Sequence, residues 1–147
     1  MENWPTFLIG GAPRSGTYSI YEYLNLMNTV FMCPTKEPNY FAPSINHAKM
    51  LSNPIRDKNE YLKLFKNVKN EKEIGETSPT YLWDPKSPEF IHKTIPNAKI
   101  IFILRNPIER SFSHYLNGIG LGYETNSFID SMNLALNQKN DYSGRIA

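Results

Sequence analysis

The segment FLIGGAPRSGT, residues 7–17, decides the fold because an apolar run leads directly into a glycine-rich loop. Gly11 and Gly16 have four residues between them, which is the glycine spacing of a phosphate-binding loop. A loop that binds nucleoside triphosphates continues with Lys and then Ser or Thr. Here Thr17 follows Gly16 at once, and the nearby cation is Arg14 inside the loop. The segment predicts a strand, an anion-binding loop and a helix, without the lysine of a triphosphate site.

The rest of the chain continues this alternation of apolar runs and helical patterns. We expect strands at residues 6–12, 30–33, 73–83 (a brief strand running into a turn) and 99–106, and helices at residues 17–27, 57–67, 87–95, 107–116 and 127–137. Ser87 is the expected N-cap of its helix, and GIGLGYETN, residues 118–126, is an expected loop. The predicted fold class is α/β, a three-layer sandwich with a central parallel sheet and a P-loop-like phosphate-binding strand–loop–helix unit.

Composition indicates an ordinary globular domain. The chain has 147 residues, of which 40% are hydrophobic and 20% charged. Its net charge of +2 is too small to argue for a nucleic-acid or membrane partner. The single cysteine, Cys33, excludes an internal disulfide framework. No secretory leader and no apolar run of about 20 residues is present, so we expect a cytoplasmic protein without a membrane partner.

The sequence also predicts the domain boundaries. We see no linker or repeat, so residues 1–147 are expected to form a single domain. The final stretch NQKNDYSGRIA carries neither a helix stop nor a closing strand. We therefore expect the chain to be the N-terminal portion of a longer domain.

The second strong strand, residues 99–104, limits the kind of phosphate chemistry. It is followed by Arg105, where a nucleoside-triphosphatase or kinase usually places a carboxylate that organises magnesium. Two strand ends with Arg and no carboxylate favour direct neutralisation of an anionic ligand by guanidinium groups, without a metal.

Four motifs together carry a family resemblance: LIGGAPRSGTYSIYEYL (8–24), KEPNYF (36–41), GETSPTYL (75–82) and KIIFILRNPIERSFSHYL (99–116). They resemble the sulfotransferases that use 3′-phosphoadenosine 5′-phosphosulfate (PAPS), and most closely the Golgi glycan and bacterial members. The resemblance spans about residues 6–138. It implies a later basic loop over the nucleotide, which this sequence does not contain.

The resemblance implies roles for single residues. The 5′-phosphosulfate contacts it implies are Pro13, Arg14, Ser15, Gly16, Thr17 and Tyr18, and the 3′-phosphate contacts are Arg105 and Ser113. The family commonly has Lys at the position of Arg14. Arginine keeps the charge but cannot donate a proton to the leaving phosphate.

KEPNYF matches the family segment whose glutamate is the catalytic base, which implies that Glu37 is the base. A carboxylate in an aromatic, proline-stiffened pocket is expected to have a raised pKa. The alternative for Glu37 is a surface salt bridge with Lys36. Glu76 lies in a strand-end turn that resembles an acceptor-side or cofactor-side loop of the family.

The expected function is in-line transfer of a sulfuryl group from PAPS to a hydroxyl or amine, with Glu37 and Arg14 as catalytic residues. The products are the sulfated acceptor, a small molecule or a glycan, and 3′-phosphoadenosine 5′-phosphate, and no metal is expected. Two alternatives stay open: a P-loop kinase or nucleotide hydrolase, and a truncated nucleotide-binding remnant without turnover. The missing loop lysine and Arg105 argue against the kinase.

Overall fold

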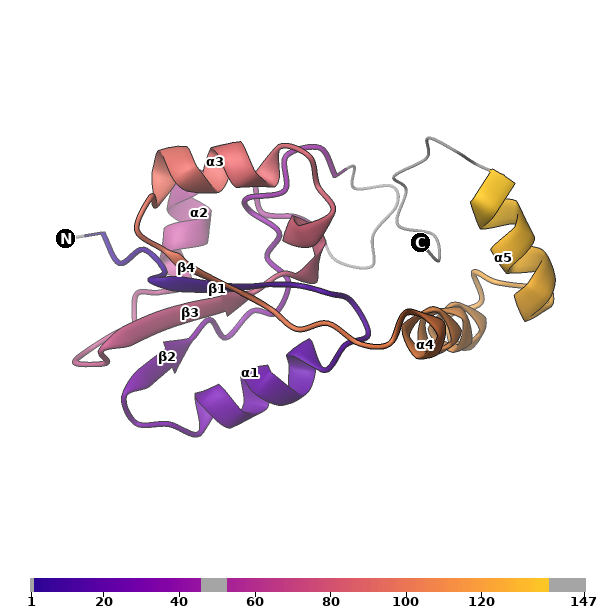
Figure 1. Ribbon diagram of the computed structural model, residues 1–147. Helices are drawn as coiled ribbons and strands as arrows, with labels where there is room; N and C mark the ends of the chain where they lie inside the picture. The colour runs from indigo at the N-terminus through magenta and orange to yellow at the C-terminus, as the bar shows by residue number, and fades with distance from the viewer. Residues whose placement is uncertain (1, 46–52, 138–147) are drawn as a thin grey trace.

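The computed structural model describes residues 2–45 and 53–137. All four strands are parallel, in the order β2-β3-β1-β4. Helix α1 covers one face of the sheet and helices α2 and α3 the other, which confirms the three-layer α/β arrangement (Figure 1). The elements are β1 (Phe7–Gly11), α1 (Thr17–Asn25), β2 (Val30–Met32), α2 (Lys58–Lys63), β3 (Glu73–Thr77), the 3-10 helix η2 (Pro79–Leu82), α3 (Ser87–Thr94), β4 (Lys99–Phe102), α4 (Pro107–Gly120) and α5 (Phe128–Asn137).

Several helix boundaries differ from the expectations: α1 ends at Asn25 and α2 spans Lys58–Lys63, against the expected 17–27 and 57–67. Ser87 is the first residue of α3, and Lys86 is its N-cap. The Asp84 carboxylate accepts the backbone N–H groups of Lys86 (2.8 Å) and Ser87 (3.1 Å), so Asp84 does the capping expected of Ser87.

Helix α4 continues to Gly120 instead of ending near residue 116. Glycine inside a helix costs only about 1 kcal/mol relative to alanine, so Gly118 and Gly120 do not end it. The helix ends where Gly122 adopts a φ of 74°, the left-handed conformation that commonly closes helices. The predicted glycine-rich loop is therefore shorter than expected.

The parallel sheet brings three loops to one edge. Strand β1 lies between β3 and β4, with Leu8 paired to both Glu76 and Ile100. Because the carboxyl ends of parallel strands meet at the same edge, the loops after β1, β3 and β4 are neighbours there. Ligands of open α/β sheets bind at this edge.

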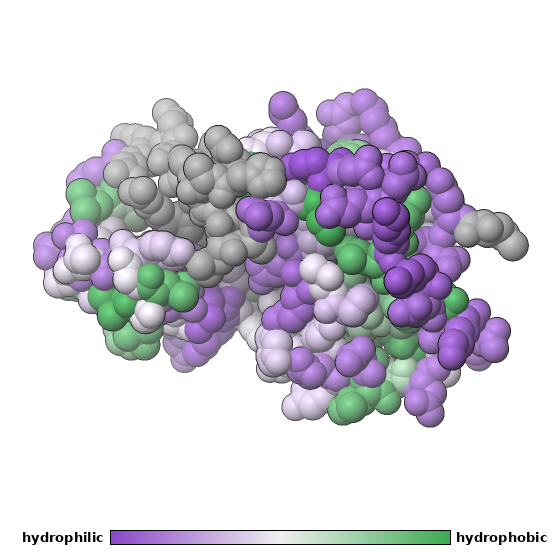
Figure 2. Space-filling model, turned by 180° about the vertical axis from the view of Figure 1, so that it is seen from behind, coloured by the Kyte–Doolittle hydropathy of each residue, from purple (hydrophilic) through white to green (hydrophobic). Residues whose placement is uncertain are grey.

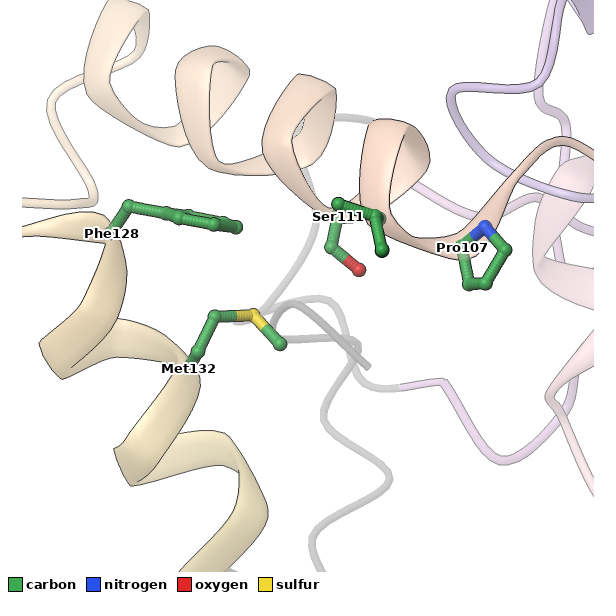
Figure 3. Close-up of a pocket in the computed structure, with 5 residues that line it drawn as sticks. Pro107, Ser111, Phe128 and Met132 are labelled. Atoms are coloured by element: carbon green, nitrogen blue, oxygen red, sulfur yellow. The ribbon is translucent and has the colours of Figure 1, made fainter.

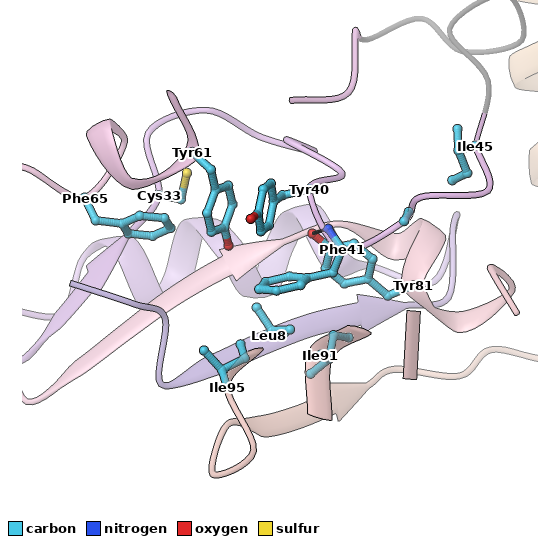
Figure 4. Close-up of a cluster of buried hydrophobic side chains, with 11 residues drawn as sticks. Leu8, Cys33, Tyr40, Phe41, Ile45, Tyr61, Phe65, Tyr81, Ile91 and Ile95 are labelled. Atoms are coloured by element: carbon cyan, nitrogen blue, oxygen red, sulfur yellow. Dashed lines mark hydrogen bonds between the residues drawn. The ribbon is translucent and has the colours of Figure 1, made fainter. Parts of the chain in front are cut away.

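An aromatic cluster forms the core between the sheet and helices α2 and α3 (Figure 4). Tyr40 and Phe41 of the KEPNYF segment are buried in it, and the Tyr40 and Tyr61 rings stack with centroids 4.2 Å apart. Phe41 N–H donates to the Tyr81 hydroxyl (3.4 Å). These two KEPNYF aromatics therefore anchor the loop that carries Glu37.

Gly75 in the middle of β3 is required by packing. A methyl group there would lie 2.7 Å from Met32 Sδ and closer still to the ring of Phe7. We expect Gly75→Ala to lower the free energy of unfolding by about 1–3 kcal/mol through overpacking, measured by urea denaturation. Gly120→Ala is the matched control, because beyond its chain neighbours and the backbone of its own helix no described atom lies within 4 Å of its added methyl. Equal urea midpoints for Gly75→Ala and the unmodified protein would contradict this account of the core.

Several apolar side chains are exposed on β4, α4 and α5. All four residues of the edge strand β4 are exposed. Apolar side chains also lie on the outer surface over α4 and α5, at the left of the view from behind (Figure 2). No helix within residues 2–45 and 53–137 is long and apolar enough to cross a membrane.

Candidate active site

The loop between β1 and α1 has the backbone of an anion-binding site. Arg14 (φ 63°) and Gly16 (φ 94°) both adopt left-handed conformations. Gly16 is the N-cap of α1 and has no side chain to bond the first N–H groups of the helix. Uncapped N–H groups at a helix N-terminus attract anions, aided by the helix dipole.

Ser15 supplies a second polar group in this loop. Its Oγ is buried and has no hydrogen-bond partner among the described residues. A buried hydroxyl without a partner is rare in folded proteins and indicates a missing ligand or water. A phosphate or sulfonate oxygen is a suitable acceptor for it, so the loop fits the 5′-phosphosulfate that the sequence predicts.

The structure brings Arg14, Ser113 and Arg105 together. Arg14 Nε donates to Ser113 Oγ (3.2 Å) across 99 residues of sequence. Arg105 Nη1 lies 3.5 Å from the backbone oxygen of Arg14, and Arg105 Nε forms an ion pair with Glu109 Oε2 at 3.2 Å. The predicted 5′- and 3′-anion contacts therefore form one positively charged site.

Asn117 is a site residue that sequence reasoning missed. Its Oδ1 accepts a hydrogen bond from Arg14 Nη1 at 3.2 Å. Asn117 lies four residues after Ser113 on α4, so both side chains share one helix face. The four-residue spacing of Ser113 and Asn117 was the signal available in the sequence. It places both side chains on one helix face, where they bind the Nε and Nη1 groups of Arg14.

Glu37 lies at the same edge of the sheet. Its backbone N–H donates to the Thr77 carbonyl at the end of β3 (2.9 Å). Burial raises the pKa of the Glu37 carboxyl, and the neighbouring Lys36 charge lowers it in part. Lys36 Nζ lies 3.7 Å from the centroid of the Tyr18 ring, which places the Lys36–Glu37 segment beside the first turn of α1.

Glu76 lies near the end of β3 and faces the core, and the acceptor-side or cofactor-side role of its loop stays a prediction. Its side chain is completely buried, since strand alternation puts it on the same face as Leu8. Burial raises the pKa of Glu76 to about 8, despite hydrogen bonds from Tyr81 and Ser78 that lower it. Glu76 is therefore mainly a neutral carboxylic acid at pH 7.

A separate apolar cavity of about 240 Å³ lies between α4 and α5 (Figure 3). Ser111 lines it together with Pro107, Phe128 and Met132. Ser111 and Ser113 are two residues apart, so they lie on opposite faces of α4. The cavity is thus distinct from the charged site around Ser113. Among residues 2–45 and 53–137, no group of three or more His, Cys, Asp and Glu side chains could hold a metal ion.

Comparisons with known proteins bear on the fold and the family of the chain. The solved structure of a sulfotransferase from Alicyclobacillus acidocaldarius superposes with a TM-score of 0.85 and 31% identity, over 98% of this chain and 64% of that one. The membrane-associated sulfotransferase kil1 of Dictyostelium discoideum is 32% identical over 111 residues, 76% of this chain and 22% of that protein. Human carbohydrate sulfotransferase 15 is 29% identical over 76% of this chain and 27% of its own length.

No protein-family model matches the chain. The chain spans about a quarter of the length of these two curated relatives and about two thirds of the bacterial structure. The sequence matches and the shared fold point to the same family that the four sequence motifs resemble. The chain belongs to the sulfotransferase family.

Proposed function

We propose that the protein transfers a sulfuryl group from PAPS to a hydroxyl or amine of a carbohydrate acceptor, by in-line displacement. The observation that carries the proposal is the hydrogen bond between Arg14 of the glycine loop and Ser113 of α4. It joins the two anion-binding segments that a nucleotide with both a 5′-phosphosulfate and a 3′-phosphate requires. The carbohydrate acceptor is supported by the named activity of the human relative.

The residues divide the binding task between the two segments. PAPS, when bound, supplies an activated sulfuryl group on a phosphate leaving group. The backbone from Pro13 to Tyr18 and the unpartnered Ser15 hydroxyl would hold the 5′ group. Arg105 and Ser113 would hold the 3′-phosphate through a guanidinium fork and a hydroxyl donor.

Glu37 and Arg14 have the catalytic roles. The Glu37 carboxylate accepts the proton of the acceptor hydroxyl or amine, and its pKa, raised by burial, makes it a better base than an exposed glutamate. The Arg14 guanidinium stabilises the negative charge that develops on the leaving phosphate. Arg14 keeps its own protons, so the leaving group departs as an anion.

Calorimetric titration tests this function against the kinase and hydrolase alternative. We expect 3′,5′-adenosine bisphosphate to bind without magnesium, and tighter than Mg·ATP. Preference for Mg·ATP would overturn the proposal. Transfer of labelled sulfate from PAPS to a carbohydrate panel then separates an enzyme from a nucleotide-binding remnant. The cytoplasmic location and the single domain over residues 1–147 stay predictions.

Arg105→Ala should weaken binding of 3′,5′-adenosine bisphosphate by about 10- to 100-fold, the effect of losing a charge-assisted hydrogen bond. Binding of 5′-AMP, which lacks the 3′-phosphate, should change little. Both affinities can be measured by isothermal titration calorimetry. Lys93→Ala on α3 is the control for loss of an exposed charge, since Lys93 pairs with Glu89 of its own helix. Equal weakening for both nucleotides would show that Arg105 does not contact the 3′-phosphate.

A further inference from the structure

The loop that carries Glu37 has a costly backbone. Glu37 (φ 51°) and Asn39 (φ 52°) both adopt left-handed conformations on either side of Pro38. Such a conformation costs a non-glycine residue about 1 kcal/mol or more, with Asn the most tolerant. It persists only where the surrounding structure holds the chain in place. The contacts of this loop should therefore show what holds it.

Asn39 is at the centre of those contacts. It has no exposed surface. Its Nδ2 donates to the backbone oxygen of Glu37 (2.7 Å), and its Oδ1 accepts from Thr80 Oγ1 (2.5 Å). Its backbone N–H donates to Ser78 Oγ (3.1 Å), and its backbone oxygen accepts from Arg56 Nη1 (3.1 Å). One buried amide thus ties the Glu37 backbone to the turn after β3.

That turn is fixed to the anion-binding edge of the sheet. Ser78 N–H donates to the Ile9 carbonyl of β1 (3.1 Å), the strand that leads into the glycine loop. Ser78 Oγ also donates to the buried Glu76 Oε2 (3.2 Å). A continuous path of hydrogen bonds runs from β1 through Ser78 and Asn39 to Glu37. The path adds to the direct hydrogen bond from Glu37 N–H to the Thr77 carbonyl in connecting Glu37 to the sheet.

We infer that Asn39, held by Thr80 and Ser78, is the positioning residue of the catalytic base Glu37. The inference rests on the proposed function, in which Glu37 takes the acceptor proton. A base must lie within hydrogen-bond reach of that proton, and a displacement of about 1 Å can cost about 100-fold in rate. The left-handed backbone alone does not require an amide side chain, because Gly tolerates the same conformation.

The pKa of the Glu37 carboxyl reports on the surroundings of this side chain and can be measured by NMR titration. Burial raises the pKa of Glu37, and Lys36 opposes the shift. Besides burial, the charge of Glu37 in turn contributes to the raised pKa of Glu76. If the loop is released, the carboxylate gains water and its pKa moves down toward the ordinary value. A loss of stability without movement of the loop would leave this pKa unchanged.

Three variants of the full-length protein test the inference. Thr80→Val removes the hydroxyl that donates a hydrogen bond to Asn39 Oδ1 and keeps the shape of the side chain. Thr80→Ser keeps the hydroxyl. Asn39→Gly keeps the left-handed backbone and removes the amide. Each variant is measured for kcat, for the Kd of 3′,5′-adenosine bisphosphate, and for the Glu37 pKa by carboxyl-carbon NMR titration. Circular dichroism confirms that each is folded at the assay temperature.

We expect Asn39→Gly to lower kcat by about 10- to 100-fold. Thr80→Val should lower kcat less, and Thr80→Ser should match the unmodified protein. The Kd of the bisphosphate should stay unchanged in all three, and the Glu37 pKa should fall in Asn39→Gly and Thr80→Val only.

Unchanged kcat and an unchanged Glu37 pKa in folded Asn39→Gly would overturn the inference. If the unmodified protein transfers no sulfate, the proposed function fails. A lowered Glu37 pKa in Thr80→Val but not in Thr80→Ser would still support positioning by Asn39 in that case.

Discussion

Glu37→Gln should reduce the rate of sulfuryl transfer by about 100- to 10,000-fold, the usual contribution of a general base. Glutamine has nearly the shape of glutamate but cannot accept a proton. The anion-binding residues Arg14, Ser113 and Arg105 hydrogen-bond to one another or to α4, and none of these contacts involves Glu37. The Kd of 3′,5′-adenosine bisphosphate should therefore stay the same. Initial rates with labelled PAPS and calorimetry measure the two quantities.

The pH dependence gives a second check on the same substitution. Only ionised Glu37 can accept a proton, and burial raises its pKa above the ordinary glutamate value. The rate should fall as the pH drops through this raised pKa, at a higher pH than for an exposed glutamate, and Glu37→Gln should remove this acid limb. Glu89→Gln on α3 is the control, because Glu89 is exposed and pairs with Lys93. A full rate in Glu37→Gln would assign the base to another group.

The sequence revealed the parts of the site that depend on local signals. The strand, glycine loop and helix of residues 7–25 follow from an apolar run and glycine spacing, which act over a few residues. Arg105 and Ser113 were instead assigned from the family motif, which lies within one strand–helix unit. Their meeting with Arg14 follows from the parallel sheet, which brings the ends of β1 and β4 together.

Local sequence signals did not reveal the residues whose role depends on the fold around them. Asn39 looks like a turn residue in KEPNYF, and only the fold places Ser78 and Thr80 against it. Glu76 looks like an exposed strand-end acid, because a charged residue is rarely buried completely. Its side chain faces the aromatic core, where Tyr81 of η2 hydrogen-bonds to it and Tyr61 of α2, a helix that precedes β3, is also buried.

Glu76→Gln should make the protein more stable at pH 8 by several kcal/mol and leave it nearly unchanged at pH 5. The pKa of Glu76 is about 8 in the folded chain, against 4.5 for the free group. Because this pKa is raised on folding, the contribution of Glu76 to the free energy of unfolding is fully present below pH 4.5 and is lost as the pH rises to 8. At about 1.4 kcal/mol per pKa unit, the loss reaches up to about 5 kcal/mol. Urea unfolding at pH 5, 6.5 and 8 measures it.

Glu73→Gln provides a control of opposite sign. Hydrogen bonds from Lys99 and Thr6 lower the pKa of Glu73. The contribution of Glu73 to the free energy of unfolding is therefore present at neutral pH and lost on acidification. Stability curves for Glu76→Gln and the unmodified protein that run parallel from pH 5 to 8 would show that Glu76 ionises normally. The expected divergence instead means that Glu76 is neutral at pH 7. A neutral Glu76 adds no negative charge near Glu37, and so does not raise the pKa of the proposed base further.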